Sequence, residues 1–198
     1  EIHERLVGSE MCIRDRGEGV APQPEIPVNV VYEDAFAVVL EKPPHLAVHP
    51  TLNYPYDTLA NGYAAWAAQQ GISPVFRPVN RIDKDTSGLL VVAKNDAAHQ
   101  ALSAQMSVHS IHRVYHAVVY GNLREDEGFV ERWIGRDPHD RKKMAVLAEN
   151  AAGARYAYTG WRVQERYGNF TYIACKLKTG RTHQIRVHMA LSLIHISE

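Results

Sequence analysis

The sequence predicts an α+β fold with a large mixed or mostly antiparallel sheet in two halves and few flanking helices. Runs of β-branched and aromatic residues recur along the chain, and short polar turns join most of them. Only two windows show the apolar spacing of an amphipathic helix. Many strands with few helices are typical of the α+β class.

A β-hairpin is the first predicted element. The runs 28–32 and 36–40 are rich in valine and aromatic residues, and Glu33 and Asp34 separate them. The segment Lys42-Pro43-Pro44 ends the second strand, because proline cannot donate a hydrogen bond to a strand ladder.

Two helices and a buried strand follow. Asp57 is predicted to cap the first helix and Gly71 to end it, and the residues on its apolar face are Leu59, Tyr63 and Trp66. The apolar run 89–93 predicts a buried strand. Asn95 or Asp96 is predicted to open the second helix, with an apolar face made of Ala98, Leu102 and Met106.

Strands dominate the remainder of the chain. On the first of them, Arg113 and Tyr115 are expected to share one face, because alternate residues of a strand point to the same side. The predicted strands span 114–120, 129–134, 143–147, 155–163 and 171–177.

Length and composition fit an ordinary globular domain. The 198 residues are 45% hydrophobic and 22% charged, which argues against wholesale disorder. There is no apolar run long enough to span a bilayer and no signal-peptide pattern. Cys12 and Cys175 are too few and too isolated for a disulfide framework or a zinc site. These features favour a reducing cytoplasm.

Both ends of the chain resemble translated sequencing adapters. We therefore expect residues 1–16 and 191–198 to be non-native tails, and 17–190 to be one catalytic domain that is incomplete at its C-terminus. Without the three basic and five acidic residues of these tails, the net charge changes from zero to +2. This charge is low for a protein that binds nucleic acid by general attraction, so local clusters must supply any RNA contact.

Two motifs carry the functional prediction. The segment 80–90 reads NRIDKDTSGLL, and 179–188 reads TGRTHQIRVH. They resemble the R-L-D-x-x-T-S-G and T-G-R-x-H-Q-I-R motifs of the RluA family of RNA pseudouridine synthases. The resemblance extends over about 28–190, and Lys42–Pro50 is similar to the family's N-K-P stretch, which we interpret as structural.

The resemblance implies a catalytic cleft between the two halves of the sheet. It also implies a reaction without cofactor, in which uridine in rRNA or tRNA becomes pseudouridine. Asp83 corresponds to the family's catalytic aspartate, as nucleophile or as base, and Arg186 to the cation that favours its ionised form. Tyr115, in a segment similar to K-x-Y-x-A, corresponds to the tyrosine that stacks on the uracil.

The resemblance also implies that several basic residues bind RNA. Arg81 matches the arginine that fills the gap left by a flipped base, and Arg181 and His183 are expected to position RNA or to support their loop. A basic loop similar to the family's G-R-x-P-x-x-R-K-K-M segment is expected to contact phosphates. Its basic residues are Arg136, Arg141, Lys142 and Lys143.

Alternative interpretations of these residues remain open. Asp83 could simply cap its turn, Arg186 could form a structural ion pair, and a charged loop often lies in solvent. A metal site is disfavoured, since His183 and His188 lie about 140° apart on a helix. The main alternative function is an RNA-binding module without catalytic activity. A metal-dependent hydrolase is a weaker one, and we expect a monomer without a protein partner.

Overall fold

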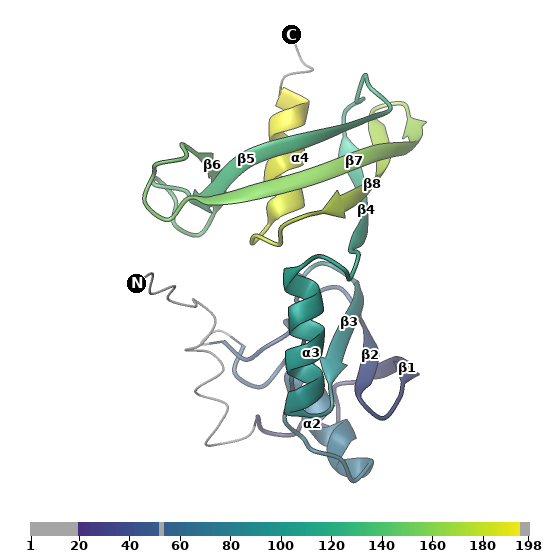
Figure 1. Cartoon of the computed structure of the whole chain (residues 1–198). Coiled ribbons are helices and arrows are strands. Elements are labelled where there is room, and N and C mark those ends of the chain that lie inside the picture. Colours follow the sequence, from purple (N-terminus) through teal and green to yellow (C-terminus); the bar gives the residue numbers. More distant parts are fainter. Residues whose placement is uncertain (1–19, 52–53, 195–198) are drawn as a thin grey trace. The chain divides into compact units, whose positions relative to one another are not determined.

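The computed structural model describes residues 20–51 and 54–194, which form two compact units that divide between Val108 and His109. Figure 1 shows the chain coloured along its sequence. The tail predicted at 1–16 lies outside the described residues, as do the last four residues of the tail predicted at 191–198. The single catalytic domain predicted for 17–190 stays a prediction.

The first unit contains a three-stranded antiparallel sheet in the order β1-β2-β3 (Figure 1). Its strands are β1 (Asn29–Glu33), β2 (Ala37–Lys42) and β3 (Gly88–Ala93). The predicted hairpin is confirmed as β1 and β2. The Asp34 carboxylate closes it by accepting hydrogen bonds from the amides of Phe36 and Ala37, each at 2.7 Å.

Helix α2 (Leu59–Gln69) has Thr58 as its N-cap residue, so the prediction that Asp57 caps it is wrong. The helix does not need a side-chain cap, because loop carbonyls satisfy its first amides. Leu59 donates to the carbonyl of Ala47 at 2.8 Å, and Ala60 donates to that of Val48 at 3.1 Å. The predicted stop is confirmed: Gly71 follows the helix with a φ of +67°.

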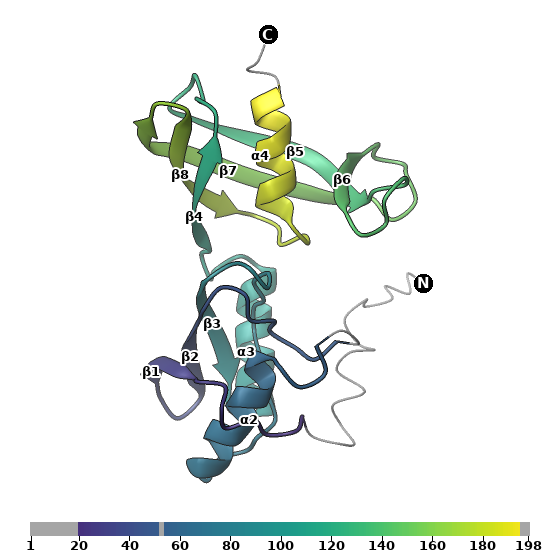
Figure 2. The ribbon, with the colours of Figure 1, turned by 180° about the vertical axis from the view of Figure 1, so that it is seen from behind.

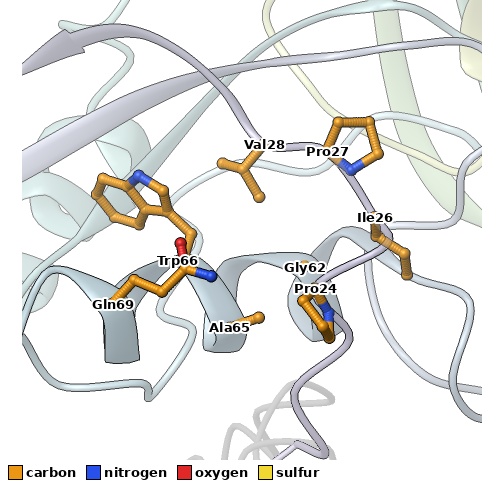
Figure 3. Close-up of a pocket in the computed structure, with 8 residues that line it drawn as sticks. All are labelled: Pro24, Ile26, Pro27, Val28, Gly62, Ala65, Trp66 and Gln69. Carbon is orange, nitrogen blue, oxygen red and sulfur yellow. The ribbon is translucent and has the colours of Figure 1, made fainter.

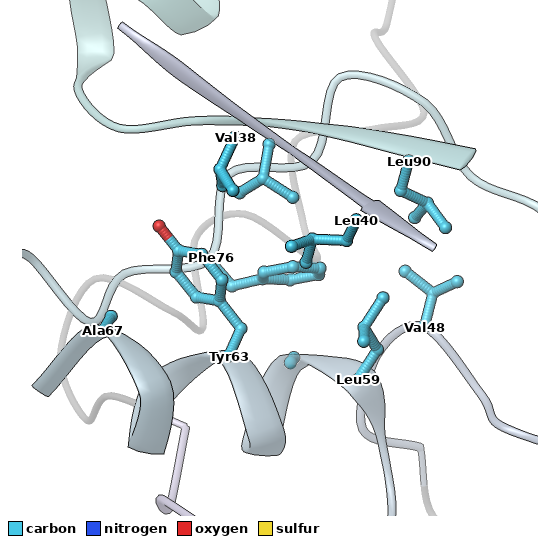
Figure 4. Close-up of a cluster of buried hydrophobic side chains, with 10 residues drawn as sticks. Val38, Leu40, Val48, Leu59, Tyr63, Ala67, Phe76 and Leu90 are labelled. Carbon is cyan, nitrogen blue, oxygen red and sulfur yellow. The ribbon is translucent and has the colours of Figure 1, made fainter. Parts of the chain in front are cut away.

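The core of this unit lies between the sheet and α2. Tyr63 and Leu59 of the helix point toward Val38 and Leu40 of β2, and all four are fully buried (Figure 4). Strand β3 is more buried on the face that carries Leu90 and Val92, because alternate residues of a strand point to opposite sides. On the other face, burial increases along the strand from Leu89 to Ala93. Leu90 is therefore buried, whereas Leu89 is 56% exposed, contrary to the predicted fully buried strand.

Helix α3 (Asp96–Ser107) confirms the predicted second helix. The Asn95 side chain caps it by accepting a hydrogen bond from the Ala98 amide at 2.8 Å. Ala98 is buried, and Leu102 and Met106 of the predicted apolar face are half-buried.

The second unit is a five-stranded antiparallel sheet in the order β4-β8-β7-β5-β6 (Figures 1 and 2). Its strands confirm the five predicted ones, within a few residues at their ends. They are β4 (Val114–Tyr120), β5 (Glu127–Arg136), β6 (Met144–Leu147), β7 (Arg155–Tyr167) and β8 (Phe170–Leu177).

One further helix, α4 (Gln184–Ile194), packs on one face of this sheet against β5, β6 and β7 (Figure 2). It carries the second half of the 179–188 motif and continues through Ile194. Met189 of α4 lies in a core with Val130 and Ile173 of the sheet. Every helix within residues 20–51 and 54–194 is too short or too polar to cross a membrane.

Candidate active site

Asp83 lies on a turn that leads into β3, which is the context predicted for it. The Thr86 amide donates to the Asp83 carbonyl at 3.1 Å, and Gly88 adopts a φ of +133° where the strand begins. A residue with a Cβ is strained at this φ, so glycine suits the position. The Asp83 side chain is half-buried.

A buried ammonium group anchors this turn. Lys42 is 0% exposed, and its Nζ donates to the carbonyls of Pro43 and Lys84, both at 2.8 Å. Burial lowers the pKa of Lys42, while the negative charges of Asp85 and Asp83 oppose that change. Lys42 thus fixes the backbone of the turn and places a positive charge near the Asp83 carboxylate.

Asn80 ties the start of the motif to the neighbouring strand. Its side chain donates to the Leu89 carbonyl at 3.1 Å and accepts from the Val91 amide at 2.8 Å. The amide side chain thereby replaces a strand partner for β3. Arg81, which follows it, is exposed, as a residue that binds RNA requires.

Polar contacts also surround the far side of the turn. His45 Nδ1 lies 3.0 Å from an Asp85 oxygen, and Lys84 Nζ donates to the Tyr54 hydroxyl at 2.8 Å. His45 has a φ of +65°, a conformation that favours glycine and is uncommon for other residues.

In the second unit, the Gln184 side chain organises the loop of the 179–188 motif. Its Oε1 accepts from the Thr179 hydroxyl at 2.7 Å and from the Arg181 amide at 3.0 Å. Its Nε2 donates to the Tyr158 carbonyl and to the Thr159 hydroxyl, both at 2.9 Å. Gln184 is 3% exposed, so this buried amide uses all four of its hydrogen-bonding positions.

The loop also carries Arg181 and His183. Arg181 is half-buried and its Nε donates to the Tyr156 carbonyl at 2.9 Å, which supports the expectation that it has a structural part. His183 has a φ of +54°, an uncommon conformation for a residue other than glycine. A Cβ on Gly180 would lie 2.7 Å from an Arg113 guanidinium nitrogen, so glycine there admits the arginine.

Tyr115 and Arg186 differ in exposure. Tyr115 is half-buried on the α4 side of β4 and packs against the core, opposite Cys175 of β8. Arg186 is exposed on the first turn of α4. Arg113, Tyr115 and Val119 share the more buried face of β4, as predicted.

His188 is fully buried in α4 and is not suited to hold a metal. Its Nδ1 lies 2.9 Å from the Thr159 hydroxyl oxygen. Burial lowers the pKa of His188 to about 4, and the charge of Arg132 adds to this effect, so the imidazole is neutral near pH 7. Within the described part of the chain, His, Cys, Asp and Glu side chains form no group of three that could bind a metal ion.

The predicted basic loop is an ordered connection between β5 and β6. The Asp137 carboxylate accepts from the amides of His139 and Asp140 at 2.8 and 3.2 Å, and Arg136 Nη1 donates to the Arg141 carbonyl at 3.0 Å. The loop side chains that were predicted to bind RNA are all exposed: Arg136, Arg141, Lys142 and Lys143.

The predicted residues thus fall into two groups. Asp83 and Arg81 belong to the first unit, whereas Tyr115, Arg186 and the other basic residues belong to the second. A site that combines Asp83 with Tyr115 and Arg186 stays a prediction. Lys42 and Gln184 had no assigned role in the predicted site, although a lysine at the end of an apolar strand was a signal for a buried cation.

A small pocket elsewhere in the first unit does not suit this chemistry. It lies between α2 and the segment 24–28 (Figure 3). Proline, aliphatic and tryptophan side chains line it, and Gln69 offers its one polar side chain among the described residues. None of the described side chains that line the pocket is an ionisable group that could act on a substrate.

Comparison with known proteins identifies the family. Residues 37–191 match the family profile described as RNA pseudouridylate synthase. The chain belongs to this family. The predicted resemblance is therefore confirmed, and so is the α+β fold class.

Curated members of the family share much of this sequence. The chain is 46% identical over 165 residues to YlyB of Bacillus subtilis, an uncharacterized RNA pseudouridine synthase, covering 82% of this chain and 53% of that protein. It is 42% identical over 190 residues to ribosomal large subunit pseudouridine synthase D of Neisseria meningitidis serogroup B, covering 94% of this chain and 50% of that protein. The chain thus spans about half the length of the curated relatives it matches.

Solved structures of the family show the same fold. The human RNA pseudouridylate synthase domain containing 1 superposes with a TM-score of 0.67 at 24% identity, covering 86% of this chain and 67% of that one. The human RNA pseudouridylate synthase domain containing 4 gives a TM-score of 0.68 at 22% identity, covering 84% of this chain and 65% of that one.

Proposed function

We propose that this chain is the catalytic part of an RNA pseudouridine synthase that acts on rRNA or tRNA. The observation that carries the proposal is the half-buried Asp83 carboxylate on a turn anchored by the buried Lys42 ammonium. A turn that only had to connect two segments would not need a fully buried cation to hold it, because burying an ammonium group costs free energy.

The proposed reaction breaks the N1–C1′ bond of uridine and forms a C5–C1′ bond. The proton leaves C5 and N1 gains one, so the step is redox-neutral and requires no cofactor. Asp83 acts as the nucleophile at C1′ or as the base at the sugar. Tyr115 stacks on the uracil, and Arg186 is the cation that favours the ionised form of Asp83.

The RNA contacts are also proposed. Arg81 fills the gap left by the flipped uridine. Arg181 and His183 position the RNA, and the exposed loop side chains Arg136, Arg141, Lys142 and Lys143 bind phosphates. We further propose that this protein is an intramolecular transferase and that it works in the cytoplasm as a monomer.

The first prediction concerns Asp83. Release of tritium from [5-³H]uridine-labelled RNA, transcribed without modification, measures turnover directly. The RNA mixture should contain both large-subunit rRNA and tRNA. The rRNA is included because a relative is named ribosomal large subunit pseudouridine synthase D. The parent chain is expected to release tritium, and Asp83→Asn to release none while RNA affinity changes by only a few-fold.

Asp96→Asn is the matched control, since Asp96 is an exposed carboxylate at the start of α3 that pairs with Arg77. It should keep full activity. Turnover by Asp83→Asn would exclude the role of Asp83. RNA binding by the parent without any tritium release would instead support an RNA-binding module.

A further inference from the structure

Two arginines of the second unit lie on the sheet face that α4 covers, outside the predicted RNA-binding set. Arg132 of β5 pairs with Ala157 of β7, and Arg155 of β7 pairs with Ile134 of β5. Ala157 and Ile134 are buried on this face, so their strand partners point to the same side. Arg132 and Arg155 are themselves exposed, which places them at the margin of the area that α4 covers.

The predicted residues Arg136 and Arg181 extend this group. Arg136 follows Arg132 and Ile134 on the same side of β5, and Arg181 bonds the Tyr156 carbonyl next to Arg155. Burial lowers the pKa of Arg181, and the nearby charge of Arg155 lowers it further. We call these four residues, Arg132, Arg136, Arg155 and Arg181, the arginine surface.

Within the described residues of this unit, no ion pair neutralises the charges of the arginine surface. Of the ion pairs found among the described residues, none joins any of its four guanidinium groups to a carboxylate. Arg132 and Arg136 donate instead to the backbone carbonyls of Glu131 and Arg141. By contrast, Arg162 and Arg166 of β7 pair with Glu127 and Asp126.

This concentration of charge is not a result of a basic composition, because the formal net charge of the chain is zero. Like charges held close together disfavour the folded state, and an anionic partner removes that cost. Arginine forms two parallel hydrogen bonds to a phosphate, which suits a surface that follows a nucleic-acid backbone. A row of phosphates is therefore the partner that this surface fits.

We propose that Arg132 and Arg155 bind the RNA phosphate backbone. Together with Arg136, Arg181 and the basic loop between β5 and β6, they form one continuous binding surface. This inference rests on the proposed function for the nature of the partner. It adds two residues from paired strands to a set that motif resemblance alone had selected.

The salt dependence of RNA binding tests the inference. The probe is a fluorescein-labelled, unmodified tRNA transcript, titrated with the full chain at several KCl concentrations. For the Arg132→Gln/Arg155→Gln variant, the slope of log K against log[KCl] should become shallower by about 1.5, since each phosphate contact contributes roughly 0.7 to 0.9. Arg132→Lys/Arg155→Lys should keep most of the slope.

Arg162→Gln is the matched control, because Arg162 lies on the opposite face of β7 and already pairs with Glu127. It should bind RNA with the slope of the parent. A melting curve should show that the double glutamine variant is at least as stable as the parent, since it loses a repulsion.

Three outcomes would overturn the proposal: an unchanged slope in the folded double variant, an equal loss in Arg162→Gln, or no RNA binding by the parent. Tritium release separates this test from that of the proposed function. A shallower slope without any release by the parent would support the arginine surface and contradict the catalytic proposal.

Discussion

At the scale of single residues, the fully buried basic side chains of Lys42 and His188 are accommodated in different ways. Removing an ammonium group from water costs several kcal/mol unless partners replace the water. Lys42 has two carbonyl acceptors and lies in the field of two carboxylates, so a charged form can be kept. His188 has a neutral hydroxyl as its partner and an arginine nearby, so it is buried without charge.

The neutral state of His188 predicts a loss of stability in acid. Its pKa is about 4 in the folded chain and 6.5 ordinarily, so between these values the unfolded chain binds the proton more readily. The stabilising contribution is complete above pH 6.5 and is lost as the pH falls toward 4. The loss amounts to about 3 kcal/mol in total. Urea unfolding at pH 7 and pH 5, followed by tryptophan fluorescence, should show the about 2 kcal/mol of this loss that is reached by pH 5.

His188→Gln should flatten this part of the stability curve, whatever its stability at pH 7. His112→Gln serves as the control, because His112 is exposed and its replacement should leave the pH dependence unchanged. An equal pH dependence in the parent and in His188→Gln would contradict the prediction.

At the scale of elements, the Gln184 network joins the motif loop, the start of α4 and strand β7. Gln184→Leu keeps a similar size but removes the hydrogen bonds of Gln184 to the buried Thr159 hydroxyl and to the part-buried Tyr158 carbonyl and Arg181 amide. We expect a loss of about 2 to 4 kcal/mol of unfolding free energy, since each unsatisfied buried polar group costs about 1 to 3 kcal/mol. Chemical denaturation measures the loss, and hydrogen exchange should show faster exchange in residues 179–188.

Gln164→Leu is the control for this change. Gln164 lies within β7, but it is exposed and its amide reaches two carbonyls only at 3.4 and 3.5 Å. It should alter stability by less than about 0.5 kcal/mol, as is usual for surface positions. A Gln184→Leu variant as stable as Gln164→Leu would show that the network does not hold the loop.

The same elements show how far sequence patterns predict this fold. The strands of both sheets follow from alternating and β-branched runs, which report a pleated surface directly. Helix α4 is absent from the predicted elements because Ile185, Val187 and their polar neighbours alternate as in a strand. The start of α2 was misplaced by one residue because carbonyls of Ala47 and Val48, distant in sequence, satisfy its first amides.

The candidate site likewise combines residues that local motifs predict with residues whose roles depend on distant parts of the chain. Asp83 and the exposed loop arginines could be found from local motifs, because turns and loops are encoded by neighbouring residues. The roles of Lys42 and Gln184 depend on partners 42 and 25 residues away in the chain. The place of Lys42 at the end of an apolar strand could indicate a buried cation, but no local pattern could reveal which groups either side chain binds. Arg132 and Arg155 become diagonal neighbours on one face only through the register of β5 and β7.

At the scale of the whole molecule, catalysis as proposed depends on residues of both units. Each unit has a hydrophobic core of its own, and Asp83 and Arg186 belong to different units. The proposed effect of Arg186 on the Asp83 carboxylate can be measured as a coupling free energy. Independent residues should give additive changes, whereas a charge pair should not.

We therefore predict non-additive unfolding free energies for Asp83→Asn, Arg186→Gln and the double variant at low salt. The expected coupling is about 0.5 to 2 kcal/mol and should decrease in high salt, because an exposed guanidinium is screened. Asp83→Asn combined with Arg162→Gln is the control and should be additive, since Arg162 already pairs with Glu127. If both pairs of substitutions were additive, Arg186 would have to act on the RNA rather than on the carboxylate, and its loss would then weaken RNA binding instead.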